Sequence, residues 1–246
     1  MRRPHSNSGF TLVELLVVIA MIALLASLLL PALVSAKASA RSAKCKSNLR
    51  QIGIGLRLYV DDFSRYPPVW LGGDAPDAFT WRSLLVPYLF GLNQSLTNRD
   101  VAELFHCPEK NRLELDEPVL AIFRRASYGY NSDGTDTSID KRRQLGLGTG
   151  SNSLLEARRN GSVSEAAVVM PVEMIAIGCT DYYYDTMVPY PERWGPGSRH
   201  RSGCNLFMCD GHVEYVKYKK VTERSNTARS RWNNDHEAHR DTWWDQ

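Results

Sequence analysis

The sequence predicts an α+β protein, in which one long N-terminal helix packs on a small antiparallel β-sheet with long irregular loops. Two observations lead to this fold class. Apolar residues recur at helical spacing over about residues 10–62, which is much longer than an average helix. Toward the other end of the chain, short β-branched and aromatic runs are separated by Asp, Gly and Ser, which indicates strands joined by turns.

The long helix begins as a purely apolar segment and continues as an amphipathic one. Residues 10–30 contain a single charged side chain, Glu14, and about 20 apolar residues are enough to cross a bilayer. Pro31 removes a backbone donor, so we expect a kink there. Beyond it, apolar residues recur at three- and four-residue steps between Lys and Arg, which predicts one face packed on a domain. Gly53 and Gly55 on this segment indicate close packing.

The rest of the chain predicts a globular domain followed by a tail. We expect two short helices at 80–89 and 98–105, strands at 127–132 and 173–180, and a hairpin at 204–218. Asp210 and Gly211 form a pair that type I′ hairpin turns favour. The stretches 133–161 and 181–200 predict irregular structure. The last 24 residues hold almost no aliphatic side chains, which predicts a tail that lies on the surface or is disordered.

Charge and composition restrict the possible functions and indicate on which side of a membrane each end of the chain lies. The formal net charge of +3 is not concentrated on a basic face, so we expect no nucleic-acid partner. Arg2 and Arg3 precede the apolar run, and the positive-inside rule then puts the N-terminus in the cytoplasm and the domain in the periplasm or outside. No phosphate-binding glycine loop, nucleophile elbow or zinc-protease motif is present in the sequence. We therefore do not expect an enzyme.

The segment "SGFTLVELLVVIAMIALLASLLLPAL" closely resembles the class III signal of type IV pilins and type II secretion pseudopilins. The resemblance implies a pilin-like fold, cleavage by a prepilin peptidase between Gly9 and Phe10, and N-methylation of Phe10. It also implies that Glu14, the fifth residue of the mature chain, is the glutamate that the family requires. The predicted organisation is a leader (1–9), a transmembrane and filament-core helix (10–30), its amphipathic continuation (31–62), a periplasmic domain (63–222) and a Trp-rich tail (223–246).

A second resemblance lies at the far end. His200 is followed by nine residues and then Asp210 and Gly211, which is similar to the prepilin-associated H-x9-DG signature of pseudopilin-like proteins, notably those of planctomycetes and verrucomicrobia. The segments "CKSNLRQIGIGLRLY", "YPPVW" and "HCPE" also look like that group. We expect the signature residues to have a structural role, with His200 tying its loop to the hairpin by hydrogen bonds.

The resemblance implies a structural subunit of a type IV pilus-like filament or of a type II secretion pseudopilus. The implied partners are the prepilin peptidase, copies of itself or other pilin subunits, and the inner-membrane assembly platform with its cytoplasmic ATPase. The expected location is the bacterial inner membrane, by a single pass, or a filament in the periplasm or at the cell surface. In such a filament Glu14 of one subunit neutralises the Phe10 amine of the next, because an unpaired charge is costly in apolar surroundings. The alternative is an uncleaved anchor that tolerates Glu14.

Several polar clusters could bind a metal ion or could have a purely structural role. His200, Asp210 and His212, with Asp181, would suggest a metal site, but Asp-Gly also makes a turn, and we expect no metal there. Residues 131–140 are rich in oxygen ligands, so calcium is an option for this loop, although Gln144 stands where an EF-hand has its bidentate Glu. His236 and His239 have poor spacing for a metal. We expect no cofactor.

The five cysteines leave two alternatives open. An exported domain permits disulfides, and Cys45 on the helix and Cys107 after a short helix are the expected pair. The other alternative is that all five are buried thiols. No zinc-site spacing is present in the sequence.

Two other classes of function compete with the filament subunit. One is a membrane-tethered binding module, such as an adhesin or substrate receptor that uses the aromatic loop 182–197. The second is a tethered metalloenzyme.

Overall fold

The computed structural model of the chain describes residues 11–71, 79–91, 98–110, 127–135, 144–148, 162–181, 186–189, 195–240 and 242. The chain divides into two compact units, residues 1–40 and 41–246, and the division falls inside the first helix. The leader, including Gly9 and Phe10, lies outside the described residues.

Helix α1 extends without a break from Leu12 to Phe63. The predicted long helix at about 10–62 is therefore confirmed. Pro31 lies inside the helix, and helical structure continues on both sides of it. The kink at Pro31 stays a prediction.

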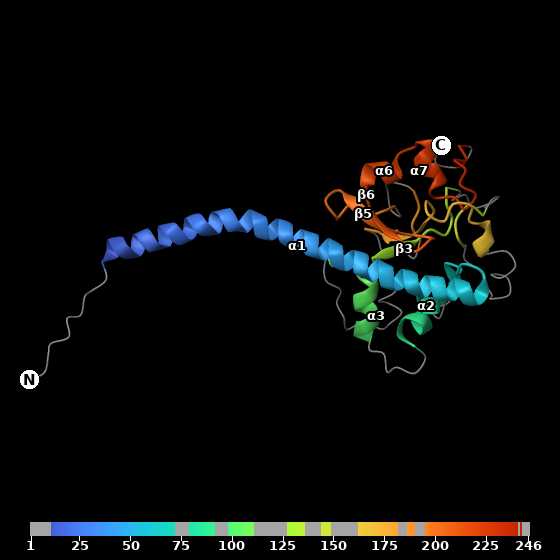
Figure 1. Cartoon of the computed structure of the whole chain (residues 1–246), viewed down its shortest axis with the longest axis horizontal. Helices are drawn as coiled ribbons and strands as arrows, with labels where there is room; N and C mark the ends of the chain where they lie inside the picture. The colour runs from blue at the N-terminus through green and yellow to red at the C-terminus, as the bar shows by residue number, and fades with distance from the viewer. Residues whose placement is uncertain are drawn as a thin grey trace, which may run out of the picture. The chain divides into compact units, whose positions relative to one another are not determined.

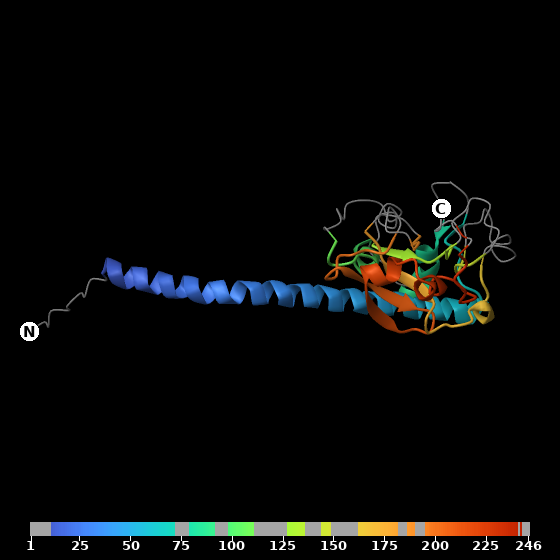
Figure 2. The same ribbon diagram turned by 90° about the horizontal axis from the view of Figure 1, so that it is seen from above.

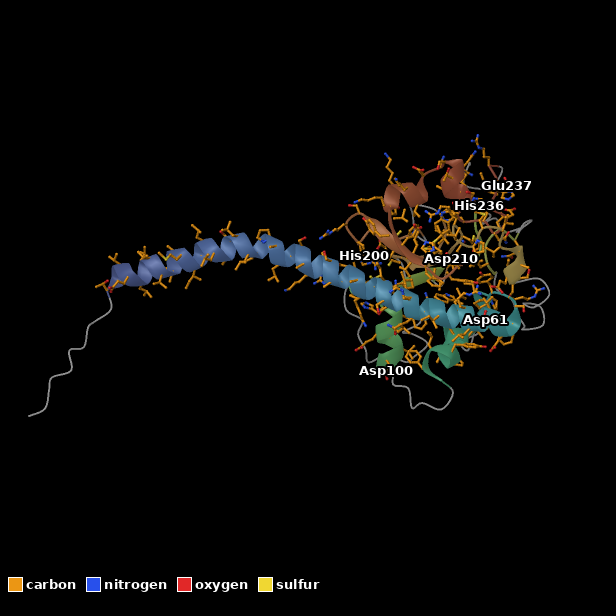
Figure 3. All side chains as sticks on the ribbon, in the orientation of Figure 1. Asp61, Asp100, His200, Asp210, His236 and Glu237 are labelled. Carbon is orange, nitrogen blue, oxygen red and sulfur yellow. The ribbon has the colours of Figure 1, made fainter. Side chains whose placement is uncertain are left out.

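In the first unit, α1 carries apolar side chains that are not buried by any described residue. Sixteen large apolar residues between Leu12 and Val34 are exposed, with Leu12 at 78% and Leu28 at 68%. Their sticks project from all sides of the ribbon (Figure 3). Among the described residues, α1 alone is long and apolar enough to cross a membrane, by length and composition. A helix that is apolar all round needs a covering of lipid or protein.

In the second unit, α1 buries one face. The buried residues recur at three- and four-residue steps; they are Cys45, Asn48, Leu49, Ile52, Gly53, Gly55, Leu56, Tyr59 and Val60. A Cβ atom on Gly53 would lie 1.9 Å from the Phe207 ring, and one on Gly55 would lie 2.8 Å from Leu89. The glycines therefore let the helix backbone approach its neighbours closely, as the sequence indicated.

The sheet has four antiparallel strands in the order β3-β4-β5-β6. Their bounds are Tyr128–Tyr130, Ile175–Cys179, Gly203–Met208 and Val213–Lys217. Each lies within a predicted strand or hairpin, apart from Gly203, which precedes the predicted hairpin by one residue. Together with α1 they confirm the α+β class. A separate two-stranded sheet pairs β1 (Trp70–Leu71) with β2 (Phe79–Thr80).

Helices α2 (Trp81–Phe90) and α3 (Asn98–Phe105) confirm the two predicted short helices. In the second unit, α1 lies between the sheet on one side and α2 and α3 on the other (Figure 1), and Figure 2 shows the sheet from above. The side-chain amide of Asn48 on α1 donates to the carbonyl oxygens of Glu103 and His106, both at 3.2 Å. Because α1 has contacts on both sides, this half of the helix is the central element of the core.

The prediction of a surface or disordered tail is wrong for the described part of residues 223–246. After α6 (Tyr218–Thr222) the chain forms α7 (Asn226–Ser230) and then buries Trp232 completely. The Trp232 indole donates to Val221 O at 3.2 Å, and Asn131 donates to Trp232 O at 2.9 Å. The segment needs few aliphatic residues because one large ring and a set of buried amide hydrogen bonds fix it.

We predict that Trp232→Ala lowers the free energy of unfolding by about 3–5 kcal/mol, since it removes a fully buried ring and leaves a cavity. Denaturant unfolding of the full chain in detergent measures the change. Arg224→Ala, at an exposed site of the same segment, is the matched control and should change little. Equal stability of the two variants would mean that the segment is no part of the core.

Candidate functional site

The first candidate site is the start of α1, where Glu14 belongs to a capping box. Thr11 precedes the helix, and its hydroxyl accepts from Glu14 N at 3.2 Å. In return, Glu14 Oε2 accepts from Thr11 N at 2.9 Å and from the Thr11 hydroxyl at 2.8 Å. This reciprocal pattern satisfies donors at the helix start, and a carboxylate there also suits the helix dipole.

The capping box gives Glu14 a role inside its own chain that the sequence analysis missed. The pattern Thr-x-x-Glu is readable in "TLVE", residues 11–14. Both hydrogen bonds from Thr11 reach the same carboxylate oxygen, Oε2. The described residues provide no donor for Oε1.

The second candidate site is the signature hairpin, where Asp210 and Gly211 turn the chain between β5 and β6. Gly211 N donates to Met208 O at 3.0 Å, and His212 N donates to Asp210 Oδ1 at 3.1 Å. Gly211 has a φ of +103°, whereas the φ of Asp210 is not positive. A type I′ turn centred on this pair needs positive φ at both positions, so the turn is of another type.

His200 lies at the other end of β5 from Asp210, and Figure 3 labels both residues. The His200 N–H donates to Gly203 O and the Gly203 N–H donates to His200 O, both at 3.1 Å, and these bonds tie the loop to the start of β5. Asp210 instead pairs with His212 at 2.7 Å, and Asp181 pairs with Arg199 at 2.5 Å. The metal set considered from the sequence, His200 with Asp210, His212 and Asp181, is therefore not assembled.

The His200 side chain faces three cysteines instead. Its Nε2 atom lies 3.2 Å from Cys107 Sγ, and Cys45 Sγ lies 3.0 Å from Cys179 Sγ. The ligand atoms of these four residues all lie within 4.8 Å of one another, and all four residues are buried. We call this group the Cys3His cluster.

The cysteines in the structure are five free, buried thiols, which was one of the two alternatives left open by the sequence. The Cys45–Cys107 disulfide is not formed here, although both residues belong to the Cys3His cluster. Cys204 and Cys209 lie outside the cluster. The oxygen-rich loop at 131–140 lies partly outside the described residues, so the expectation of no cofactor, with calcium as an option in this loop, stays a prediction.

The close contacts within the Cys3His cluster shift the pKa values of its members in different directions. Hydrogen bonds from Cys179 and Cys45, followed by His200, hold the pKa of Cys107 below its usual value against the effect of burial. Burial raises the pKa of Cys179. For His200, burial lowers the pKa, but the bonds to Cys107 and Cys45 outweigh it and raise the pKa to about 10.

The family follows from a comparison with known proteins. Residues 34–160, more than half of the chain, match the family model described as "Protein of unknown function (DUF1559)". The chain belongs to this family. Residues 4–30 of this DUF1559 protein match the prokaryotic N-terminal methylation motif, which confirms the predicted prepilin-type signal.

Two curated relatives resemble part of this DUF1559 protein. Type II secretion system core protein G of Aeromonas hydrophila is 41% identical over 69 residues, which are 28% of this chain and 48% of that protein. Type II secretion system core protein G of Klebsiella michiganensis is 43% identical over 65 residues, 26% of this chain and 46% of that protein. The matches span about half the length of these relatives. No solved structure matches the chain.

We predict that Gly211→Ala destabilises the hairpin by about 1–2 kcal/mol, because an L side chain is strained at this positive φ. Steric clash is no part of the effect, since a Cβ atom there would have no described neighbour within 4 Å. The thermal midpoint of the full chain measures the loss. Gly211→Asn should lose less, since Asn tolerates positive φ better. A midpoint unchanged by Gly211→Ala would show that the turn does not need glycine.

Proposed function

We propose that this DUF1559 protein is a structural subunit of a pilus-like filament, either a type II secretion pseudopilus or a type IV pilus-like fibre. In this proposal a prepilin peptidase removes residues 1–9, and Phe10 becomes the methylated N-terminus. The chain is held in the inner membrane by one pass, with its N-terminus in the cytoplasm and its domain in the periplasm. An inner-membrane platform and its ATPase then assemble it with copies of itself or sister subunits.

The proposal rests on the exposed apolar residues of the first half of α1, from Leu12 to Val34, together with the methylation motif at residues 4–30. Large apolar side chains are exposed all round the helix from Leu12 to Val34. Lipid covers such a surface before assembly, and helices of other subunits cover it in a filament core. The similarity to two type II secretion core proteins G supports the filament over a permanent anchor.

Glu14 adds a reason for the helices to bundle in register. Its Oε2 atom is occupied by Thr11, whereas Oε1 accepts from no described residue. In a membrane that half-satisfied carboxylate is costly. A neighbour's Phe10 amine would supply the opposite charge and one more donor. The pairing would therefore favour one axial position of the incoming subunit.

The first prediction concerns processing. Mass spectrometry of the mature protein, made in cells that contain its prepilin peptidase, should find an N-terminal peptide that begins at methylated Phe10. Gly9→Val should reduce this processing, because a side chain at the cleavage site obstructs a protease that works at the membrane face. Intact Met1 in assembled filaments would contradict the proposal.

The second prediction separates the charge of Glu14 from its capping role. Glu14→Gln keeps a side chain that serves in a capping box but removes the charge. It should insert into the membrane normally and fall about tenfold or more in filament incorporation, measured in sheared filaments against the membrane pool. Thr11→Val is the matched control, since it removes the hydroxyl partner and keeps the carboxylate, and it should assemble.

Normal incorporation of Glu14→Gln would contradict an assembly role of the charge. If Thr11→Val failed to assemble while Glu14→Gln succeeded, Glu14 would act only as a helix cap.

A further inference from the structure

Four potential metal ligands from four distant segments meet inside the second unit. Cys45 lies on α1, Cys107 follows α3, Cys179 is the last residue of β4, and His200 precedes β5. Sequence separations of 134 residues for Cys45 and Cys179 and 93 for Cys107 and His200 show that folding, not local chain geometry, brings them together.

We propose that Cys45, Cys107, Cys179 and His200 bind one zinc ion as a structural site that fastens α1 to the rest of the domain. Nothing in this proposal depends on the filament function.

The geometry of the cluster suits a tetrahedral ion. Zn–S bonds of about 2.3 Å and Zn–N bonds of about 2.0–2.1 Å put tetrahedral ligand atoms roughly 3.5–3.8 Å apart. The observed separations run from 3.0 Å, between Cys45 and Cys179, to an upper limit of 4.8 Å. Adjustments below about 1 Å would therefore place all four atoms around one ion.

The donor set selects zinc and a structural role. Three thiolates and one imidazole form one of the usual structural zinc sets, and soft sulfur ligands disfavour calcium and magnesium. Exposure of the four residues is at most 3%, so the site is closed to solvent and leaves no open position for a substrate. A catalytic zinc keeps such a position for water. The enclosed cluster therefore gives no support to a tethered metalloenzyme.

Two arginines bond to the backbone beside the cluster, and one of them, Arg199, also pairs with Asp181. Zinc with three thiolates carries a net charge of about −1. Arg82 is fully buried and donates to the carbonyl of Tyr128, which pairs with Cys179 across the sheet. Arg199 donates to the carbonyl of Thr180, the residue after Cys179. One guanidinium group thus bonds to the strand neighbour of Cys179 and the other to the residue that follows it.

Lys110, three residues after Cys107, adds a third basic group to this region. Its pKa is lowered to about 7, first by burial and then by Arg199 and Arg82, while Asp181 and Cys107 act in the opposite direction. A zinc-bound set of thiolates would add negative charge beside Lys110.

A disulfide between Cys45 and Cys179 is the competing state. The two sulfur atoms lie 3.0 Å apart, whereas a disulfide bond is about 2.05 Å. Such a bridge would use two of the four residues. Cys107 and His200 alone would then be too few ligands to complete a structural zinc site.

The test begins with the full chain, purified in detergent with reductant and without chelator. Elemental analysis should find about one zinc per chain. Cobalt substitution should give the visible spectrum of tetrahedral cobalt with thiolate charge-transfer bands. Removal of the metal with a chelator should lower the thermal midpoint, and added zinc should restore it.

Three variants make the assignment specific. Cys107→Ser should lose most of the bound zinc. His200→Cys should keep it, because four cysteines also form a structural zinc set, and this variant covers the case that Cys107→Ser fails to fold. Cys209→Ser replaces another buried thiol, outside the cluster, and should keep zinc at the wild-type level.

Three results would overturn the proposal: no metal bound after reconstitution with zinc, equal loss of zinc in Cys209→Ser and Cys107→Ser, or a Cys45–Cys179 disulfide in protein isolated directly from cells. Because metal content is measured on the unassembled chain, each result is independent of whether the chain forms filaments.

Discussion

The structure depends on one constraint: a single continuous helix has to satisfy two different surroundings. From Leu12 to Val34 its apolar side chains are exposed in every direction, and from Cys45 to Val60 it buries one face in a folded domain. The first half has no stable place in water, so lipid or other helices must cover it. The second half cannot leave the domain without exposing its core. The apolar first half accounts for a place in the membrane and, in our proposal, for filament assembly. The second half accounts for the attachment of the helix to the domain.

The domain holds its half of the helix by close contact on both sides. Gly53 lets the Phe207 ring of β5 approach the helix backbone, and Asn48 bonds to carbonyls at the end of α3. Cys45 is the first fully buried residue of α1 and also a member of the Cys3His cluster. A bound zinc would thus fix the helix near the point where the compact unit begins, at Arg41.

Local sequence patterns predicted most of the helices and strands, but they did not predict which residues from distant parts of the chain come together. The long helix, both short helices and the four strands of the main sheet were readable because periodicity and turn residues act over a few positions. The short strands β1 and β2 were not predicted. Trp232 was missed because its segment has few aliphatic residues, and Asn131, which donates to its carbonyl oxygen, is 101 residues away along the chain. The Cys3His cluster was missed for the same reason: its members span Cys45 to His200, and no zinc motif has such spacing. The segments "CKSNLRQIGIGLRLY" and "HCPE" and the H-x9-DG signature each contribute one of its residues, but only the fold shows that they meet.

The central claim is that the bare half of α1 is covered by lipid first and by other subunits after assembly. Site-specific photo-crosslinking from Leu24, which is 64% exposed, tests it most directly. A benzophenone side chain at this position should give lipid adducts in membranes that lack the assembly platform. In sheared filaments it should give adducts to the N-terminal helix of another subunit. Adducts to residues 41–246 of the same chain in both states would contradict the account, because the apolar half would then be covered by its own domain.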